Sequence, residues 1–324
     1  MSIRAVLLLW LCALPTAQAA QNHLLIVSGI GGTDAFDHQF SATSTRLYQA
    51  ALDAGIGQDN IDLLSAAPLA EISSAQRDSS KTSLLQSIGD IAARAGPGDR
   101  VFIVLIGHGN PRGGGAVFNL PGPDITAAEL AGALDVLGEQ LVVVVNTASA
   151  SGPFIKALSA PQRVVITATS SGREYHATLF GDHFARAFSG GAADTNKDER
   201  ISMLEAFEFA RREVRRAFES DKRLLTEHAL LDDNGDGEGS LEPGEFEPDG
   251  ALANRVYLQQ APALALGSSA ELVGMVQRKQ ELEQAISELK RERDGLARED
   301  YYTRLENLLV DLALLSREIR AQGG

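Results

Sequence analysis

The sequence predicts an α/β fold in which a mostly parallel sheet is covered by helices on both faces. Two observations support this prediction. Between residues 22 and 170, short apolar runs alternate with amphipathic segments of helical length. The runs at 101–106 and 141–145 are apolar at almost every position, which is typical of strands buried on both faces. Strands and helices in alternation favour a parallel sheet between two helical layers.

The first half of this region is expected to contain three strands and two helices. In order, these are the strand 23–27, the helix 42–54, the short strand 61–64, the helix 80–95 and the strand 101–106. Ser79 or Ser80 can cap the second helix, and Gly96 ends it, because serine suits an N-cap and glycine the residue after the last turn.

The second half continues the same alternation. Its expected elements are the strand 117–120, the helix 126–137, the strand 141–145, a short helix near 153–158 and the strand 164–169. Thr126 with Glu129 three residues later forms the pattern of a capping box, in which each side chain bonds the other residue's backbone amide.

Length and charge limit the classes of function. The 324 residues fit one large domain or two ordinary ones, and the formal net charge is −14. Such an acid excess, without a basic cluster, argues against nucleic acid or an anionic membrane surface as partner. Acid-rich loops fit calcium better.

Residues 1–19 have the pattern of a signal peptide. Arg4 gives a positive start, residues 5–14 form an apolar core too short to span a bilayer, and Ala17-Gln18-Ala19 is a small-residue cleavage site. We therefore expect export to the periplasm or the extracellular space, with a mature chain that begins near Ala20. Because Cys12 is the only cysteine, that chain would form no disulfide.

The ends of two predicted strands carry the candidate chemistry. The strand 101–106 runs into Gly107-His108-Gly109, and the strand 141–145 runs into residues 146–152, which include Ser149. In an open parallel sheet both ends meet at the carboxyl edge, where ligands bind. A histidine beside a small nucleophile is a plausible base–nucleophile pair. The structural alternative is a histidine held in a glycine turn and a serine that caps a helix.

These segments resemble the legumain family of caspase-fold cysteine peptidases. The Gly-His-Gly turn is similar to the family's histidine segment, and Thr147-Ala148-Ser149-Ala150-Ser151-Gly152 is similar to its Glu-Ala-Cys-Glu-Ser-Gly nucleophile segment. Phe36-Asp37-His38-Gln39 resembles the Tyr-Arg-His-Gln that follows the first strand, and Leu120-Pro121-Gly122 a legumain-like turn. The resemblance covers about residues 23–190 and implies a caspase-like α/β domain that cleaves peptide bonds.

The resemblance also implies a role for individual residues. His108 aligns with the catalytic histidine and Ser149 with the catalytic cysteine, and the amides of Gly109 and Ser149 would form the oxyanion hole. His38 aligns with a residue of the substrate pocket, while Asp37 stands where the family has an arginine. In the same pocket, Thr147 replaces a glutamate. In addition, Gly31 stands where legumains carry an asparagine that supports the histidine.

The exchange of cysteine for serine changes the chemistry that the site requires. A thiol ionises near pH 8.5, whereas a serine hydroxyl needs a general base in direct contact, usually one oriented by a carboxylate. The sequence shows no evident carboxylate for His108. We therefore expect a catalytically impaired peptidase homologue. Two alternatives remain open: a serine-dependent endopeptidase or hydrolase, and a non-catalytic, calcium-stabilised binding or scaffold module.

A calcium loop of the EF-hand type is predicted at 194–205. Its ligand positions are occupied in order by Asp194, Asn196, Asp198, the carbonyl of Arg200, Ser202 and the bidentate Glu205. Glu199 stands where the motif usually has glycine, which is expected to strain the turn without removing a ligand.

A second acidic loop begins at Asp232 and matches the motif only in part. Asp232, Asn234 and Asp236 fit its first half, but Pro243 stands in place of the bidentate glutamate. Glu242 or Glu245 are candidates to substitute for it. Calcium binding and an ordinary turn are equally compatible with this segment.

The C-terminal segment, residues 268–324, has two apolar stripes at helical spacing, and these are typical of a helical hairpin or coiled coil. The stripes consist of Leu272, Val276, Lys279, Leu282, Ile286 and Leu289, then Leu305, Leu308, Leu312, Leu315 and Ile319. The hairpin either folds back on its own domain or serves self-association or a partner. The expected organisation is thus a signal peptide at 1–19, the peptidase-like domain at 20–190, the calcium-binding segment at 191–267 and the hairpin.

Overall fold

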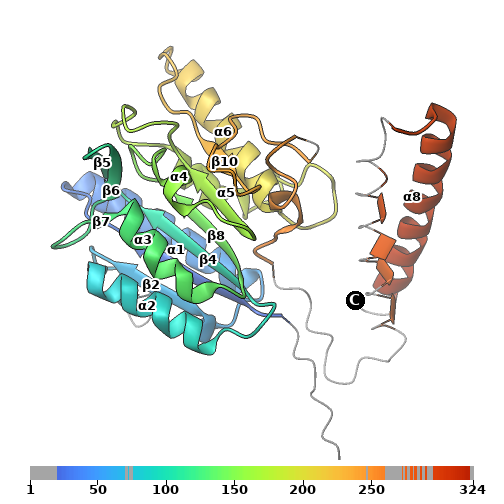
Figure 1. The fold of residues 1–324 in the computed structure, drawn as a ribbon, viewed down its shortest axis with the longest axis horizontal. Helices are drawn as coiled ribbons and strands as arrows, with labels where there is room; N and C mark the ends of the chain where they lie inside the picture. Colours follow the sequence, from blue (N-terminus) through green and yellow to red (C-terminus); the bar gives the residue numbers. More distant parts are fainter. Residues whose placement is uncertain are drawn as a thin grey trace, which may run out of the picture.

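A seven-stranded sheet forms the centre of the molecule, with strand order β10-β9-β8-β4-β1-β2-β3 (Figure 1). The computed structural model describes residues 20–69, 72, 76–245, 247–259 and 295–321, together with scattered residues between 272 and 289. The proposed signal peptide, including Cys12, lies outside the described residues.

Six of the seven strands run parallel, and only β10 pairs antiparallel, with β9. The strands are β1 (Asn22–Ser28), β2 (Ile61–Ser65), β3 (Gln76–Arg77), β4 (Arg100–Ile106), β8 (Leu141–Asn146), β9 (Arg163–Thr167) and β10 (Leu230–Asp232). The predicted α/β class with a mostly parallel sheet is confirmed.

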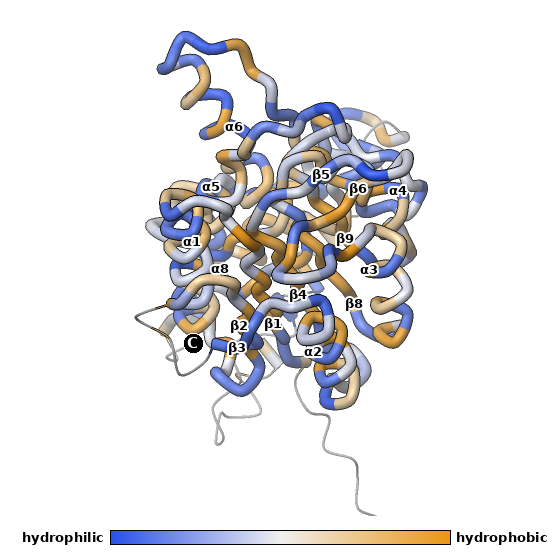
Figure 2. Tube along the Cα trace, turned by 90° about the vertical axis from the view of Figure 1, so that its left-hand side faces the viewer, coloured by the Kyte–Doolittle hydropathy of each residue, from blue (hydrophilic) through white to orange (hydrophobic). Residues whose placement is uncertain are grey.

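Helices cover both faces of this sheet. One face carries α1 (Asp34–Asp53), α5 (Phe180–Ala187) and α6 (Met203–Ser220). The other carries α2 (Lys81–Arg94), α3 (Ala127–Leu134), the 3-10 turn Asp135–Leu137 and α4 (Phe154–Leu158). Figure 2 shows the apolar strands enclosed between the two helical layers.

Alternate residues of each strand enter opposite cores, as the pleat of a strand requires. Leu24 and Ile26 of β1 face the core beneath α1, whereas Leu25 and Val27 face the core beneath α2. Each face therefore needs apolar side chains, which explains why the strands read as continuous apolar runs.

The first helix begins earlier than the sequence pattern suggested. We expected it at 42–54, but α1 starts at Asp34, because the Thr33 side chain accepts a hydrogen bond from the Phe36 amide and caps the helix. This difference places residues 36–39 on the first turns of a helix rather than in a loop.

Two caps agree with the sequence analysis, whereas a small second sheet had been only partly predicted. Ser80 caps α2, and Thr126 with Glu129 forms a complete capping box on α3.

The second sheet is an antiparallel arrangement of β5 (Gly109–Arg112), β6 (Gly115–Phe118) and β7 (Ile125–Thr126). Of these strands, only the region of β6 had been expected.

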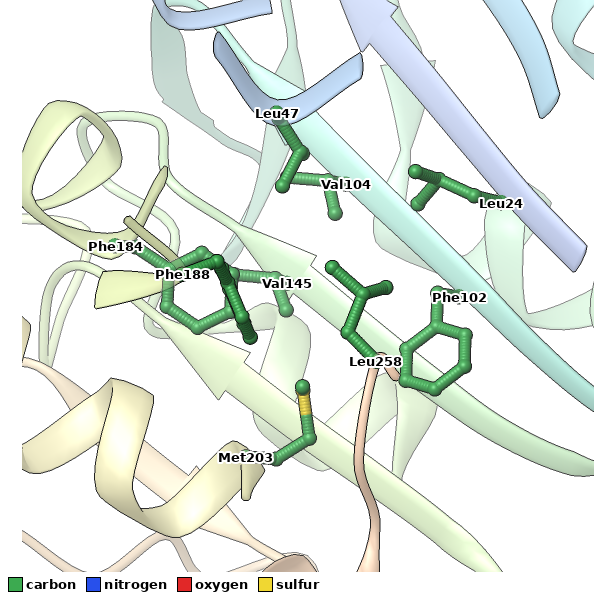
Figure 3. A pocket seen from close by; sticks show the side chains of 9 residues that line it. All are labelled: Leu24, Leu47, Phe102, Val104, Val145, Phe184, Phe188, Met203 and Leu258. Carbon is green, nitrogen blue, oxygen red and sulfur yellow. The ribbon is translucent and has the colours of Figure 1, made fainter. Parts of the chain in front are cut away.

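The segment that follows β10 returns to the core, and the described part of this segment ends at residue 259. It includes the 3-10 turn Ala253–Arg255, and the Met203 amide donates to the Val256 carbonyl. The Leu258 side chain projects into a small apolar cavity of about 10 Å³, with Met203 and Phe102 among its other lining residues (Figure 3). Only apolar side chains line this cavity, so it is a packing space inside the core.

The second arm of the expected hairpin is α8 (Arg298–Ala321), which stands apart from the sheet in Figure 1. Much of the first arm lies outside the described residues, but Leu282, Ile286 and Leu289 are helical and buried. No helix within the described part of the chain is long and apolar enough to cross a membrane.

Candidate functional site

The two candidate strand ends are neighbours at the carboxyl edge of the sheet. Strands β4 and β8 pair in parallel, with Leu105 opposite Asn146, and the Thr147 amide donates to the Leu105 carbonyl. The turns that carry His108 and Ser149 therefore leave adjacent strands on the same edge, as the sequence predicted.

Ser149 is buried, with 2% of its surface exposed, and its hydroxyl is paired in both directions with one residue. The Ser149 Oγ accepts a hydrogen bond from the Gly109 amide at 3.1 Å and donates one to the Gly109 carbonyl at 3.0 Å. The hydroxyl thus joins the two turns. It also occupies the Gly109 amide, which the family resemblance assigns to the oxyanion hole.

Gly109 has to be glycine for this contact to form. A Cβ atom at this position would lie 2.5 Å from the Ser149 carbonyl oxygen and 2.8 Å from that of Val117. Any side chain would therefore push the histidine turn away from the Ser149 turn.

His108 is half-buried against the first helix. Its ring lies edge-on to Phe36, at 4.5 Å between centroids, and close to Phe40, at 5.0 Å. Burial lowers the pKa of His108, although the hydrogen bond that the ring donates to the Gly31 backbone opposes this effect. Burial thus favours the neutral form of the imidazole. Among the described residues, no carboxylate hydrogen bonds to it.

The predicted pocket residues of the first helix take different positions. Asp37 is half-buried and its Oδ1 accepts a hydrogen bond from the Gly31 amide at 2.9 Å. A Cβ at Gly31 would lie 2.5 Å from the Asp37 amide, so the asparagine found here in legumains would not fit without movement of the helix. His38 is exposed on the next position of α1.

Thr147, the third predicted pocket residue, is 3% exposed. Its hydroxyl donates to the Leu105 carbonyl at 2.9 Å, and its own carbonyl accepts a hydrogen bond from the Thr178 hydroxyl at 2.6 Å. The side chain is thus used to pack the strand end, and it lies against Gly181 at the start of α5.

Sequence reasoning missed a carboxylate network beside the Ser149 turn. The Glu174 carbonyl accepts a hydrogen bond from the Ala150 amide, and Ala150 has a left-handed φ of 53°. The Glu174 carboxylate accepts from His228 Nδ1 at 3.0 Å. These residues lie in polar segments without periodicity, so no pattern in the sequence marks them.

A second buried carboxylate, that of Glu227, contacts the N-terminal end of α5. Its carboxylate accepts hydrogen bonds from the amides of Leu179 and Phe180. Burial raises the pKa of Glu227 to about 7, and the nearby charge of Glu174 adds to this rise, while the two amides oppose it.

The first predicted calcium loop adopts the turn of the motif. Glu199, at the position where glycine is usual, has a left-handed φ of 67°, as expected of a strained turn. The Asp194 carboxylate accepts hydrogen bonds from the amides of Lys197, Asp198 and Glu199. The remaining positions carry Asn196, Arg200 and Ser202.

Glu205 connects the two ends of this loop. Its Oε1 accepts from the Thr195 amide, and its Oε2 accepts from the amide and hydroxyl of Ser202, which caps α6. Glu205 is buried, with 4% of the residue's surface exposed. It is thus anchored at the place where the motif needs its bidentate ligand.

The second acidic loop, which begins at Asp232, also adopts the turn of the calcium motif, and Gly235 and Gly237 have left-handed φ angles. The carboxylate of Asp232 accepts from the Gly235 amide, and that of Asp236 accepts from the Glu238 amide. Burial and the neighbouring carboxylates, among them Asp232, raise the pKa of Asp249 to about 6. Within the described residues, no group of three or more His, Cys, Asp or Glu side chains is arranged so that it could hold a metal ion.

Comparison with known proteins gives one family match. Residues 80–228 match the model of the Peptidase C13 family, the legumain family, and this range includes both His108 and Ser149. The match supports the resemblance to legumains over this part of the chain.

Among solved structures, the chain is similar to a crystal structure of a Geobacter sulfurreducens protein. The two share 12% identity with a TM-score of 0.43, over 65% of this chain and 92% of that one. A comparison with curated proteins found no match.

Proposed function

We propose that this chain is an exported, catalytically impaired homologue of the legumain-type peptidases that binds peptide or protein ligands at the carboxyl edge of its sheet. One observation carries the proposal. The Ser149 hydroxyl is buried and bonded to both the amide and the carbonyl of Gly109. To attack a peptide, it would have to break both bonds and return that amide to the oxyanion hole.

The environment of His108 supports the same conclusion. A serine nucleophile requires an imidazole that contacts the hydroxyl and is oriented by a carboxylate. His108 is instead held by its hydrogen bond to the Gly31 backbone and by the rings of Phe36 and Phe40. Its lowered pKa also weakens it as a base.

We propose further that the first acidic loop binds calcium and stabilises this domain. The left-handed turn at Glu199 and the anchored carboxylates of Asp194 and Glu205 support this part of the proposal. Oxygen ligands from carboxylates and a backbone carbonyl are those that calcium prefers.

A fluorophosphonate probe tests the catalytic part directly. We expect the wild-type protein to label no faster than Ser149→Ala, because the hydroxyl is already paired and lacks an oriented base. Labelling of the wild type that disappears in Ser149→Ala would contradict impairment and identify a serine hydrolase.

A cysteine variant tests whether the turn still resembles a peptidase site. In Ser149→Cys, a thiolate beside His108 needs less help from a base than an alkoxide does. We expect weak labelling by peptide-based thiol alkylators and little peptide turnover. Ser151→Cys is the matched control, because Ser151 is equally buried and lies two residues further along the same segment. Rapid turnover by Ser149→Cys would show an intact substrate pocket.

A further inference from the structure

The acidic loop that follows β10 receives a carboxylate from outside its own sequence motif. The loop takes the path of a calcium loop, with Asp232 at the first ligand position and Asp236 at the fifth, but the twelfth position is Pro243. A search restricted to the motif therefore finds only half a site. The structure brings Asp249, six residues beyond that proline, back against the start of the loop.

Reciprocal hydrogen bonds hold Asp249 in this position. Its Oδ1 accepts from the Asp233 amide at 3.2 Å, and the Asp233 carboxylate in turn accepts from the amides of Gly250, Leu252 and Ala253. Both oxygens of the Asp233 carboxylate thus accept backbone hydrogen bonds, and Asp233 acts as a clip that fixes residues 250–253 beside the loop. Asp249 is 3% exposed and sits beside Asp232 as a consequence of that clip.

One carboxylate oxygen of the cluster is left without a partner. Asp232 is 1% exposed, and its Oδ2 is buried with no hydrogen-bond donor, while its Oδ1 accepts from the Gly235 amide. Within the described residues, neither Asp232, Asp236 nor Asp249 forms an ion pair. A buried, unpaired carboxylate beside two others is costly unless a cation compensates it.

We propose that this cluster is a second calcium site, bound by Asp232, Asn234, Asp236 and the carbonyl of Glu238, and closed by Asp249 in place of the motif's glutamate. All of these ligands are oxygen atoms, which suits a hard divalent cation. As the side chains stand, no group of three or more His, Cys, Asp or Glu among the described residues could hold a metal ion. Ion binding therefore turns Asp236 and Asp249 toward the unpartnered oxygen of Asp232.

Glu242, one of the two candidates that the sequence offered for the closing ligand, is less well placed. Glu242 lies next to Pro243 in the sequence, but it is exposed and forms an ion pair with Arg211 at 3.6 Å. Asp249 is buried and already in electrostatic contact with Asp232 and Asp236. Glu242 therefore serves as the control residue.

The proposed ion would connect the edge of the sheet to the segment that closes the core. Asp232 ends β10, and the chain after Asp249 continues to Leu258, whose side chain enters the core in Figure 3. The Asn22 side chain donates to the Leu258 carbonyl at 2.9 Å. Binding would thus stabilise the packing of residues 249–258. This inference does not depend on the chemistry of Ser149.

Calcium titration of the full chain tests the proposal. Isothermal titration calorimetry should give two sites in the wild type and one in Glu205→Gln, which disables the first loop. In the Glu205→Gln background, we expect Asp249→Asn to weaken the remaining site at least tenfold and Glu242→Gln to leave it unchanged. Unchanged binding in the Asp249→Asn variant, or loss of both sites in Glu205→Gln alone, would overturn the proposal.

Melting curves separate a calcium ligand from a merely structural carboxylate. Asparagine keeps the acceptor for the Asp233 amide and removes a repelling charge. We therefore expect Asp249→Asn to melt higher than the wild type in a chelator but lower in excess calcium. A decrease of equal size in both conditions would overturn the assignment. Asp236 is exposed, so Asp236→Asn should show the same reversal without disturbing the core.

Discussion

At the scale of single residues, the Ser149 hydroxyl is a structural connection between two strand ends. Because it bonds both polar groups of Gly109, Ser149→Ala would leave a buried donor and acceptor without partners. We expect a loss of about 1–3 kcal/mol in the free energy of unfolding, measured by urea denaturation. Ser44→Ala is the control, since Ser44 is fully buried but its hydroxyl has no hydrogen-bond partner. Equal losses in both variants would show that the Gly109 contacts contribute nothing specific.

A second residue-scale prediction concerns pH. The pKa of Glu227 rises to about 7 in the folded protein from an ordinary value near 4.5, so the folded state binds more protons between these two values. The contribution of Glu227 to stability therefore falls as pH increases from about 4.5 to 7, and the shift corresponds to about 3 kcal/mol.

Glu227→Gln should remove this part of the pH dependence, because glutamine does not ionise. Unfolding free energies at pH 5 and pH 7.5 would measure the effect, with the exposed Glu219→Gln as control. If the slope between these pH values is the same in the wild type and in Glu227→Gln, the raised pKa is not responsible for it.

The site could be predicted from the sequence only where a strand end supplied the signal. The positions of His108 and Ser149 at one edge follow from two apolar runs and the rule for parallel strands. Their actual partners do not, because Phe36 and Phe40 reach His108 only if the first helix begins at Asp34. The contact between Glu227 and the Phe180 amide joins residues that are 47 positions apart in the sequence, and no local pattern predicts such a contact.

At the scale of elements, the first acidic loop accepts strain that the sequence had indicated. Glu199 has a left-handed φ of 67°, a conformation that costs roughly 1 kcal/mol or more for a residue with a Cβ. Glu199→Gly should therefore raise the calcium-free unfolding free energy by about 0.5 kcal/mol, after subtraction of the extra entropy of glycine in the unfolded chain.

The comparison variant for this prediction is Glu238→Gly. Glu238 is also an exposed loop residue but lies outside the left-handed region, so the same change should lower stability. Differential scanning calorimetry of both variants in a chelator would measure the two effects. If both changes have the same sign, relief of strain at Glu199 is not the cause.

Element boundaries were predictable where a side chain caps a helix and a polar stretch separates two apolar runs. Ser80 and Thr126 begin α2 and α3 at the expected residues. By contrast, α1 begins eight residues before the expected position, because the Thr33 cap starts the helix at Asp34 and the apolar positions Phe36 and Phe40 belong to its first turns. The short strands β5 and β7 could not be predicted from the sequence. β5 consists of glycine, asparagine, proline and arginine, and β7 has only two residues, so neither shows an alternating apolar pattern.

At the scale of the whole molecule, the sheet domain and the C-terminal hairpin are separate hydrophobic units. Among the described residues, the core beneath α1 extends to Leu258 and the core beneath α2 extends to Leu230, and neither includes a residue beyond 268. Leu282, Ile286 and Ile319 are buried nonetheless, and Figure 1 shows the described pieces of the first arm alongside α8. These buried side chains of the C-terminal segment therefore belong to neither described core of the sheet domain.

Removal of residues 268–324 should leave the sheet domain folded, because none of its described side chains belongs to either core. We expect the truncated protein to keep the melting temperature of the full chain within about 2 °C, since a difference of 1 kcal/mol shifts a domain of this size by only a few degrees. Sedimentation equilibrium of both proteins would then assign any self-association. The outer face of α8 exposes Leu309, Val310 and Leu314, so association that requires residues 268–324 would locate the interface there. Failure of the truncated chain to fold would instead show that the hairpin completes the domain.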